Sequence, residues 1–209
     1  DGLNRALFLP FVAVLKSNAE IINLDSPTDH RLEKLNSQPV YLTPLGPATD
    51  RQIGEAWKAM THGHRTAPET IRVKGHEIAV PAAAGRSARF EFADLCEQPL
   101  GARDYLAIAA RYSTLFVEHV PVLGEARRNE AKRLILLVDT LYDQHARLVV
   151  SAEAPPQDLY VSKRGTEGFE FDRTVSRLIE MQSREWLDDW AARQAEKGEA
   201  PLDLAAAAD

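Results

Sequence analysis

Three short apolar segments between residues 89 and 152 alternate with segments of helical periodicity. The apolar segments are 89–93, 114–120 and 147–152, and the helical segments between them are 101–112 and 125–145. Strands joined by helices of this length pair in parallel, because the helix carries the chain back to the end of the sheet where the previous strand began. We therefore predict an α/β fold, with a mainly parallel sheet and helices on its faces.

The preceding residues have a different pattern. Apolar residues recur every fourth position over 1–17, which indicates a helix. Residues 40–43 and 50–60 predict a strand and a helix, and residues 70–80 alternate around Lys74 and Gly75, which is typical of a hairpin. We interpret residues 37–88 as a small β-rich insertion.

At the other end, residues 172–194 have the periodicity of one final helix, which carries Trp186 and Trp190 on one face. Core packing is the default interpretation of these two side chains, and a partner-binding face is the alternative. Residues 195–209 contain Gly, Pro and a run of Ala, and we expect a disordered tail there.

Charge and composition exclude several classes of function. The chain has 25 Lys and Arg against 31 Asp and Glu, a net charge of −6, so we expect no nucleic-acid partner, because phosphate affinity depends on clustered cations. A single cysteine, Cys96, cannot form an internal disulfide. No apolar run approaches the roughly 20 residues that a membrane-spanning helix needs. The first residue is Asp1, inside an apolar helical pattern, and we expect the chain to be a fragment.

Several blocks of residues resemble one family from end to end. The first reads Asp-Gly-Leu-Asn-Arg-Ala-Leu-Phe-Leu-Pro-Phe at 1–11, and the others lie at 29–32, 41–45, 90–96, 99–106, 129–133, 151–155 and 171–182. In this order they are similar to the ZapE-type AAA+ ATPases of bacterial cell division and their mitochondrial lactation-elevated relatives. The resemblance implies a P-loop-NTPase-like (AAA+) three-layer sheet with helices on both faces.

The resemblance also implies an order of functional parts. In this family the phosphate loop, the acidic strand that positions Mg²⁺ and a polar sensor strand all precede the block at 1–11. We therefore expect this chain to be the C-terminal part of such an ATPase. Residues 1–36 would end the AAA+ core, and residues 89–194 would form a second, degenerate core-like domain. The intact protein would use ATP and Mg²⁺.

No Gly-x-x-x-x-Gly-Lys-[Ser/Thr] motif occurs in the chain. The nearest pattern, Gly85-Arg86-Ser87, lacks the first glycine and has Arg in place of Lys. We therefore expect this chain alone to bind no ATP tightly and to be inactive as an ATPase.

Arg5 is the candidate catalytic residue that the resemblance supplies. It falls on the helix after the sensor strand, where AAA+ proteins carry an arginine finger. A planar, permanently charged guanidinium can stabilise charge on a phosphoryl group bound by a neighbouring subunit. The alternative is an ordinary ion-paired Arg, although a cation near a helix start is unfavourable against the helix dipole.

The resemblance implies a second candidate in the block at 171–182: Arg177, for nucleotide sensing or for a subunit interface. It lies four residues after Arg173, so both share one helical face. The alternative for both is ion pairing with Asp172, Glu180 or Glu185.

Other chemically interesting residues have simpler interpretations. Glu118 falls where a catalytic acid would lie in a second core, but we favour a structural carboxylate because no nucleotide is expected there. His62, His64 and His76 lack the Cys or acidic partners of a metal site at usual spacings. We expect Cys96 to be a small buried hydrophobe.

Two functions remain open from the sequence. The first is the C-terminal region of an ATP-hydrolysing protein in bacterial cell division, which supplies the arginine finger, a homo-oligomer interface at the Arg5 face and a surface for a protein target such as a division-ring component. Its location would be cytoplasmic in a bacterium or mitochondrial in a eukaryote. The alternative is a non-catalytic α/β protein-interaction domain that binds no nucleotide.

Overall fold

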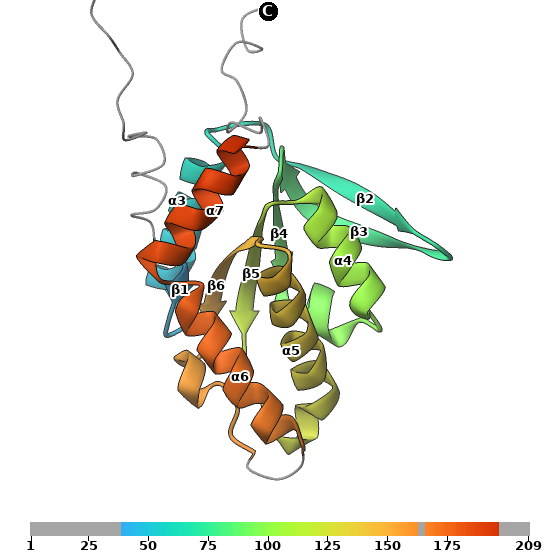
Figure 1. The fold of residues 1–209 in the computed structure, drawn as a ribbon, viewed down its shortest axis with the longest axis vertical. Helices are drawn as coiled ribbons and strands as arrows, with labels where there is room; N and C mark the ends of the chain where they lie inside the picture. The colour runs from blue at the N-terminus through green and yellow to red at the C-terminus, as the bar shows by residue number, and fades with distance from the viewer. Residues whose placement is uncertain (1–38, 163–165, 197–209) are drawn as a thin grey trace, which may run out of the picture. The chain divides into compact units, whose positions relative to one another are not determined.

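The computed structural model describes residues 39–162 and 166–196. All of them belong to the second of two compact units in the chain, residues 34–209. Six strands form one sheet in the order β1-β6-β5-β4-β3-β2 (Figure 1). The strands are β1 (Tyr41–Leu42), β2 (Ala67–Val73), β3 (His76–Ala84), β4 (Ser87–Glu91), β5 (Thr114–Val120) and β6 (Arg147–Ala152).

The sheet is parallel at one side and antiparallel at the other. Neighbouring strands from β1 through β6 and β5 to β4 pair in parallel, and β4, β3 and β2 pair antiparallel. This confirms the prediction that 89–93, 114–120 and 147–152 share a mainly parallel sheet. All but one residue of β5 and every residue of β6 are buried, as expected for strands covered on both faces.

The predicted hairpin is β2 and β3, which pair from Val73 and His76 at the turn. Gly75 has φ of 101°, a left-handed conformation that favours glycine at this turn. β3 continues the sheet next to β4, while β1 pairs with β6 at the other end. The segment 37–88 thus supplies both edges of the same sheet that residues 89–152 complete.

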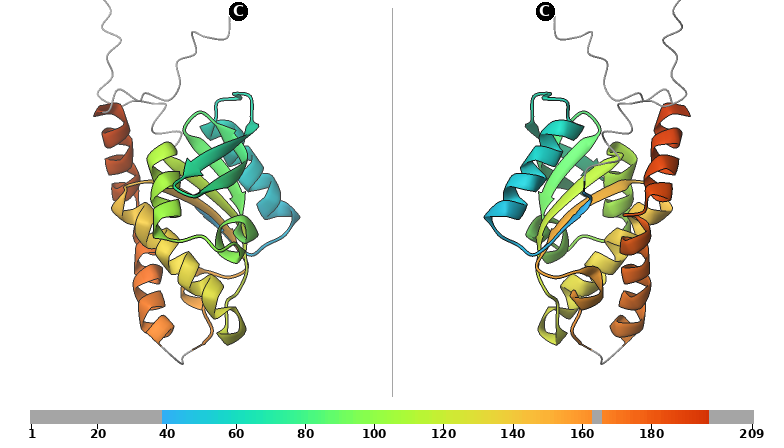
Figure 2. Two further views of the ribbon diagram at one scale, coloured as in Figure 1. Left: turned by 90° about the vertical axis from the view of Figure 1, so that its right-hand side faces the viewer. Right: turned by 90° about the vertical axis from the view of Figure 1, so that its left-hand side faces the viewer.

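Helices cover both faces of the sheet, which makes three layers. Figure 2 shows α3, in blue, on one side and α5 and α6, in yellow and orange, on the other. The helices are α3 (Pro47–Met60), α4 (Ala102–Arg111), α5 (Arg128–Asp143), α6 (Thr166–Glu180) and α7 (Arg184–Glu196), with short turns η1 (Ala93–Glu97), η2 (Glu125–Arg127) and η3 (Pro156–Asp158). No helix in the described ranges is long and apolar enough to span a membrane.

Helix α3 is anchored to the sheet by its apolar face. It begins with Pro47 at its first position, where the missing N–H costs nothing. Ile53 and Trp57 are buried, and the Trp57 ring meets the Phe116 ring of β5 edge to face, with centroids 5.1 Å apart. This packing holds the middle and the last turns of α3 against the strands.

The prediction of one helix over 172–194 is wrong. Helix α6 ends at Glu180 and α7 begins at Arg184. The Ser183 hydroxyl accepts a hydrogen bond of 3.1 Å from the backbone N–H of Trp186, so Ser183 caps the second helix, α7. Trp186 and Trp190 are both buried, which confirms that they belong to the core.

Candidate functional site at the carboxyl edge of the sheet

The carboxyl ends of the four parallel strands meet at one edge of the sheet, where ligands bind in open α/β folds. Polar side chains gather there from three strands and from the first turn of α3. We call this group the carboxyl-edge cluster; it consists of Asp50, Arg89, Glu91, Glu118, His119 and Ser151.

Strand register explains why these side chains meet. Glu91 of β4 is in register with Glu118 of β5, and Arg89 is in register with Phe116. Residues two apart in a strand share a face. Since Phe116 packs against α3, the side chains of Arg89, Glu91 and Glu118 also lie on the α3 side of the sheet.

Glu118 is a buried carboxylate that is held by Arg89. Its side chain is 3% exposed. Arg89 donates to it from both Nε and Nη2, and the Nη2–Oε2 distance is 2.7 Å. This two-point hydrogen bond raises the pKa of Arg89 further above its usual range, against the opposing effect of burial. The pair is therefore an internal ion pair that satisfies both oxygens of Glu118.

His119 lies at an irregularity of β5. Its φ is 56°, and the β5–β6 register shifts between Val117 and Val120. The backbone N–H of His119 donates a hydrogen bond to the Ser151 hydroxyl at 3.0 Å. The bulge turns the imidazole toward two carboxylates: Nδ1 is 2.7 Å from Glu91 Oε2 and Nε2 is 3.3 Å from Asp50 Oδ1.

The charges of the cluster do not suit a phosphate group. Three carboxylates face one permanent cation, Arg89, which is already paired with Glu118. Phosphates are held by cations and by free N–H groups at a helix start. The start of α3 offers a proline at its first position instead, and the Thr49 hydroxyl donates to the Pro44 carbonyl.

A metal ion is the other ligand to consider for this cluster. Glu91, Glu118 and His119 each offer a ligand atom, and these atoms lie within 4.8 Å of one another. However, Arg89 occupies both oxygens of Glu118 and supplies the positive charge that a metal would bring. Since Glu118 is committed to Arg89, the residues present fit an ion-paired polar cluster better than a metal centre.

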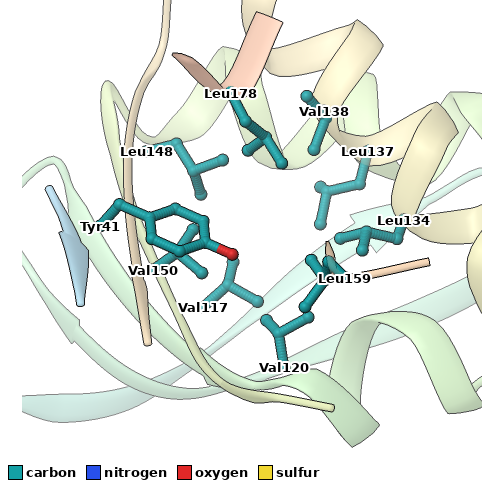
Figure 3. Close-up of a pocket in the computed structure, with 10 residues that line it drawn as sticks. All are labelled: Tyr41, Val117, Val120, Leu134, Leu137, Val138, Leu148, Val150, Leu159 and Leu178. Atoms are coloured by element: carbon teal, nitrogen blue, oxygen red, sulfur yellow. The ribbon is translucent and has the colours of Figure 1, made fainter. Parts of the chain in front are cut away.

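The opposite face of the sheet contains a small apolar cavity (Figure 3). Its volume is about 10 Å³, and its lining from β5, β6, α5 and α6 is aliphatic. The one polar lining group, the Tyr41 hydroxyl, donates to the Ala154 carbonyl at 2.8 Å. A nucleotide needs a far larger pocket, on the order of 300 Å³ or more. The cavity is a packing defect with space for one water at most.

Arg177 lies in the interface between α6 and α5. Its guanidinium pairs with Asp139 at 2.6 Å and with Asp143 at 3.3 Å, and it lies 4.6 Å above the Tyr142 ring. Arg173 also pairs with Asp139. Ion pairing was one of the two interpretations, but the partners are on α5 and not at the expected positions Asp172, Glu180 and Glu185.

The remaining predicted residues are spread over the structure. Arg5 lies outside the described residues, as does all of the segment 1–36. His76 Nε2 is 2.9 Å from Asp104 Oδ1, and within the described part of the chain His62, His64 and His76 form no metal-ligating group. Cys96 is fully buried, and burial raises the pKa of its thiol well above its usual value.

Five cluster residues did not stand out in the sequence as site candidates: Asp50, Arg89, Glu91, His119 and Ser151. The available signal was the interruption of apolar strands by charge, at Arg89 and Glu91 in one strand and at Glu118 and His119 in the other. Predicted parallel pairing of these strands would have brought the two interruptions together. Asp50 gave no such signal, because its place depends on the packing of α3.

The class of protein follows from the fold and the family match together. A three-layer α/β domain with mostly parallel strands is consistent with a P-loop NTPase-like architecture. Over residues 1–189 the chain matches the AFG1-like ATPase family, whose members are AAA+ proteins. The chain belongs to this family, as the sequence blocks predicted.

Relatives of this family are similar over most of the chain. Cell division protein ZapE of Escherichia coli K12 is 35% identical over 187 residues, which are 90% of this chain and 49% of that protein. Lactation elevated protein 1 homolog B of Danio rerio is 33% identical over 219 aligned residues, 89% of this chain and 44% of that protein. The chain thus spans about half the length of these relatives. No solved structure matches it.

Proposed function

We propose that this chain is the C-terminal region of an ATP-hydrolysing AAA+ protein that works as an oligomer. The observation that carries the proposal is the family match over residues 1–189. ATP and Mg²⁺ would be held by a phosphate loop and acidic strand outside these 209 residues. The present region would supply an arginine finger, part of the subunit interface and a surface for a protein target.

Arg5 is the proposed finger. A guanidinium that reaches the nucleotide of the next subunit neutralises charge that develops on the transferred phosphoryl group. Arg5 is part of the family-matching block at residues 1–11. Arg177 is the weaker candidate, because Asp139 and Asp143 already neutralise its charge.

Residues 89–194 are proposed as a second core that binds no nucleotide. The sequence contains no phosphate-loop motif. The carboxyl-edge cluster supports this, because it is acidic and its one permanent cation, Arg89, is already paired with Glu118. We extend the proposed core to β1, because it pairs with β6, and to α3, because its Trp57 packs on Phe116 of β5.

The cellular role is proposed from the name of a relative. The Escherichia coli protein is named for cell division. By this likeness the whole protein would act in bacterial cell division in the cytoplasm, on a protein component of the division ring. A eukaryotic member would act in mitochondria.

The test compares two proteins: the 209-residue chain, and the longer protein encoded around it. Titration with a fluorescent ATP analogue should give no micromolar binding to the chain alone, whereas the longer protein should bind and hydrolyse ATP. Micromolar binding of the analogue to the chain alone, displaced by unlabelled ATP, would contradict the proposal that ATP is held outside these 209 residues.

A non-catalytic interaction domain is the second candidate. The internal Arg89–Glu118 pair favours it for the described residues, because this pair occupies the edge where a ligand would bind. Absence of ATP hydrolysis from the longer protein, with a fold shown to be intact, would support this candidate over the first.

A further inference from the structure

The His119 imidazole lies between two carboxylates that come from different elements. Glu91 ends β4 and Asp50 lies in the first turn of α3. One ring nitrogen is 2.7 Å from a Glu91 oxygen and the other is 3.3 Å from an Asp50 oxygen. The His119 side chain therefore connects the first turn of α3 to the carboxyl ends of β4 and β5.

Hydrogen-bond chemistry decides which form of the ring fits this place. A neutral imidazole has one N–H and one lone pair, so it can donate to only one carboxylate. Its lone pair would then face the second carboxylate, which is repulsive. Only the imidazolium donates from both nitrogens, and it also places one positive charge between two negative ones.

The backbone holds the ring in this position. The left-handed conformation of His119, the bulge in β5 and the N–H bond to Ser151 fix the start of the side chain. The imidazole therefore starts from the same backbone position beside Glu91 and Asp50 whether or not it is protonated. Loss of the proton weakens the contacts, because the neutral ring donates to only one of the two carboxylates.

We infer that protonated His119 is a pH-dependent bridge that fastens the first turn of α3 to the carboxyl ends of β4 and β5 and loosens when the imidazolium loses its proton at higher pH. This bridge is independent of the proposed ATPase function. It holds the start of α3, and with it the end of the loop of residues 43–46 that leads into α3.

Other charged groups near the ring modify this bridge without reversing it. On β4, Arg89 would oppose protonation of His119, but its charge is matched by Glu118 of β5. On η1, Asp94 accepts a hydrogen bond from the Glu91 N–H. β6 contributes the neutral Ser151. The hydrogen bond with Glu91 is the largest cause of a raised His119 pKa, while partial burial lowers it.

The direction of the pH effect follows from linkage. A histidine whose folded pKa is raised above its unfolded value stabilises the fold most at a pH below the unfolded pKa, about 6.5. This stabilisation is lost as the pH rises through the folded pKa. The bridge is thus closed at a pH below about 6.5 and opens as the pH rises through the raised folded pKa.

The test is an NMR titration of the imidazole signals of the whole 209-residue chain. The chain has six histidines, and the signal that disappears in His119→Asn belongs to His119. Asn tolerates a left-handed backbone, so this variant keeps the local fold. We expect a His119 pKa above about 6.5.

Asp50→Asn should lower the His119 pKa by about half a unit or more. Glu55→Gln removes a charge from the same helix at an exposed position that is not a partner of His119, and it should leave the pKa within about a tenth of a unit. In urea unfolding, the midpoint difference between the natural chain and His119→Asn should be larger at pH 6 than at pH 9.

Three results would overturn the inference. The first is a His119 pKa at or below about 6.5. The second is a pKa that responds equally to Asp50→Asn and Glu55→Gln. The third is suppression of the His119 titration by added zinc with recovery in chelator, which would assign the cluster to a metal ion.

Discussion

The ion pair of Arg89 and Glu118 is the residue-scale feature on which the carboxyl edge depends. Glu118 is almost fully buried, while a third of the Arg89 side chain is exposed. Loss of the arginine would leave a buried carboxylate without its partner. A lone buried charge is far more costly than the pair is stabilising.

Arg89→Met should therefore lower the free energy of unfolding by about 3 kcal/mol, measured by urea unfolding at pH 7. The double variant Arg89→Met with Glu118→Leu should recover most of that loss, because it removes the unpaired charge. If Arg89→Met costs under about 0.5 kcal/mol, the ion pair is not what satisfies Glu118.

Arg177 makes the second prediction at this scale. It pairs with two aspartates of α5 and lies over the Tyr142 ring. Because this network is partly buried, Arg177→Ala should lower the free energy of unfolding by about 1–3 kcal/mol. Arg177→Lys should recover less than half, since a point charge cannot make the forked contact or stack on the ring.

The control is Arg184→Ala, which breaks an exposed pair with Asp188 and should cost no more than about 0.5 kcal/mol. Equal effects of Arg177→Ala and Arg184→Ala in thermal unfolding would show that the α5–α6 contact contributes little. Arg177 would then be available for a role at a subunit interface.

At the scale of elements, the start of α7 after the break is capped by Ser183. Ser183 accepts the Trp186 N–H, and Trp186 stacks on Tyr142 with ring centroids 4.7 Å apart. Ser183→Ala should cost about 1 kcal/mol, and Ser183→Asn or Ser183→Asp should cost almost nothing. Guanidinium unfolding measures the difference; identical losses in all three variants would contradict the capping role.

The strands and their pairing could be predicted because their signals are local. Apolar runs with helices between them dictate parallel neighbours, and Lys74-Gly75 marks the hairpin. The break after Glu180 was not predictable in this way, because Met181-Gln182-Ser183 contains no Gly or Pro and helical periodicity continues across it. The break becomes evident only when Met181 and Trp186 are both seen to be buried.

The carboxyl-edge cluster could not be predicted from the sequence either, because its residues come from distant segments. Glu118 was weighed because it falls where a catalytic acid would lie in a second core. Its partner Arg89 precedes it by 29 positions, and Asp50 lies 69 positions before His119. Such contacts are set by strand register and by the packing of Trp57 on Phe116, which the sequence pattern does not specify.

For the whole molecule, the central claim is that this region completes an ATPase site that it does not itself contain. The family match and the acidic, internally paired carboxyl edge support that claim. In the longer protein, Arg5→Ala should leave ATP binding nearly unchanged and reduce turnover by about 10³-fold. Arg5→Lys should restore little, because a flexible point charge does not reproduce the planar guanidinium.

Subunit mixing tests this claim most directly. An Arg5→Ala protein is combined with a protein whose phosphate loop is inactivated, and steady-state ATP turnover is measured. If Arg5 acts on the neighbouring subunit, some pairs join an intact loop to an intact finger, and turnover should recover in part. No recovery, or a loss in Arg5→Ala that a lowered melting temperature fully explains, would contradict the account and make Arg5 a structural residue.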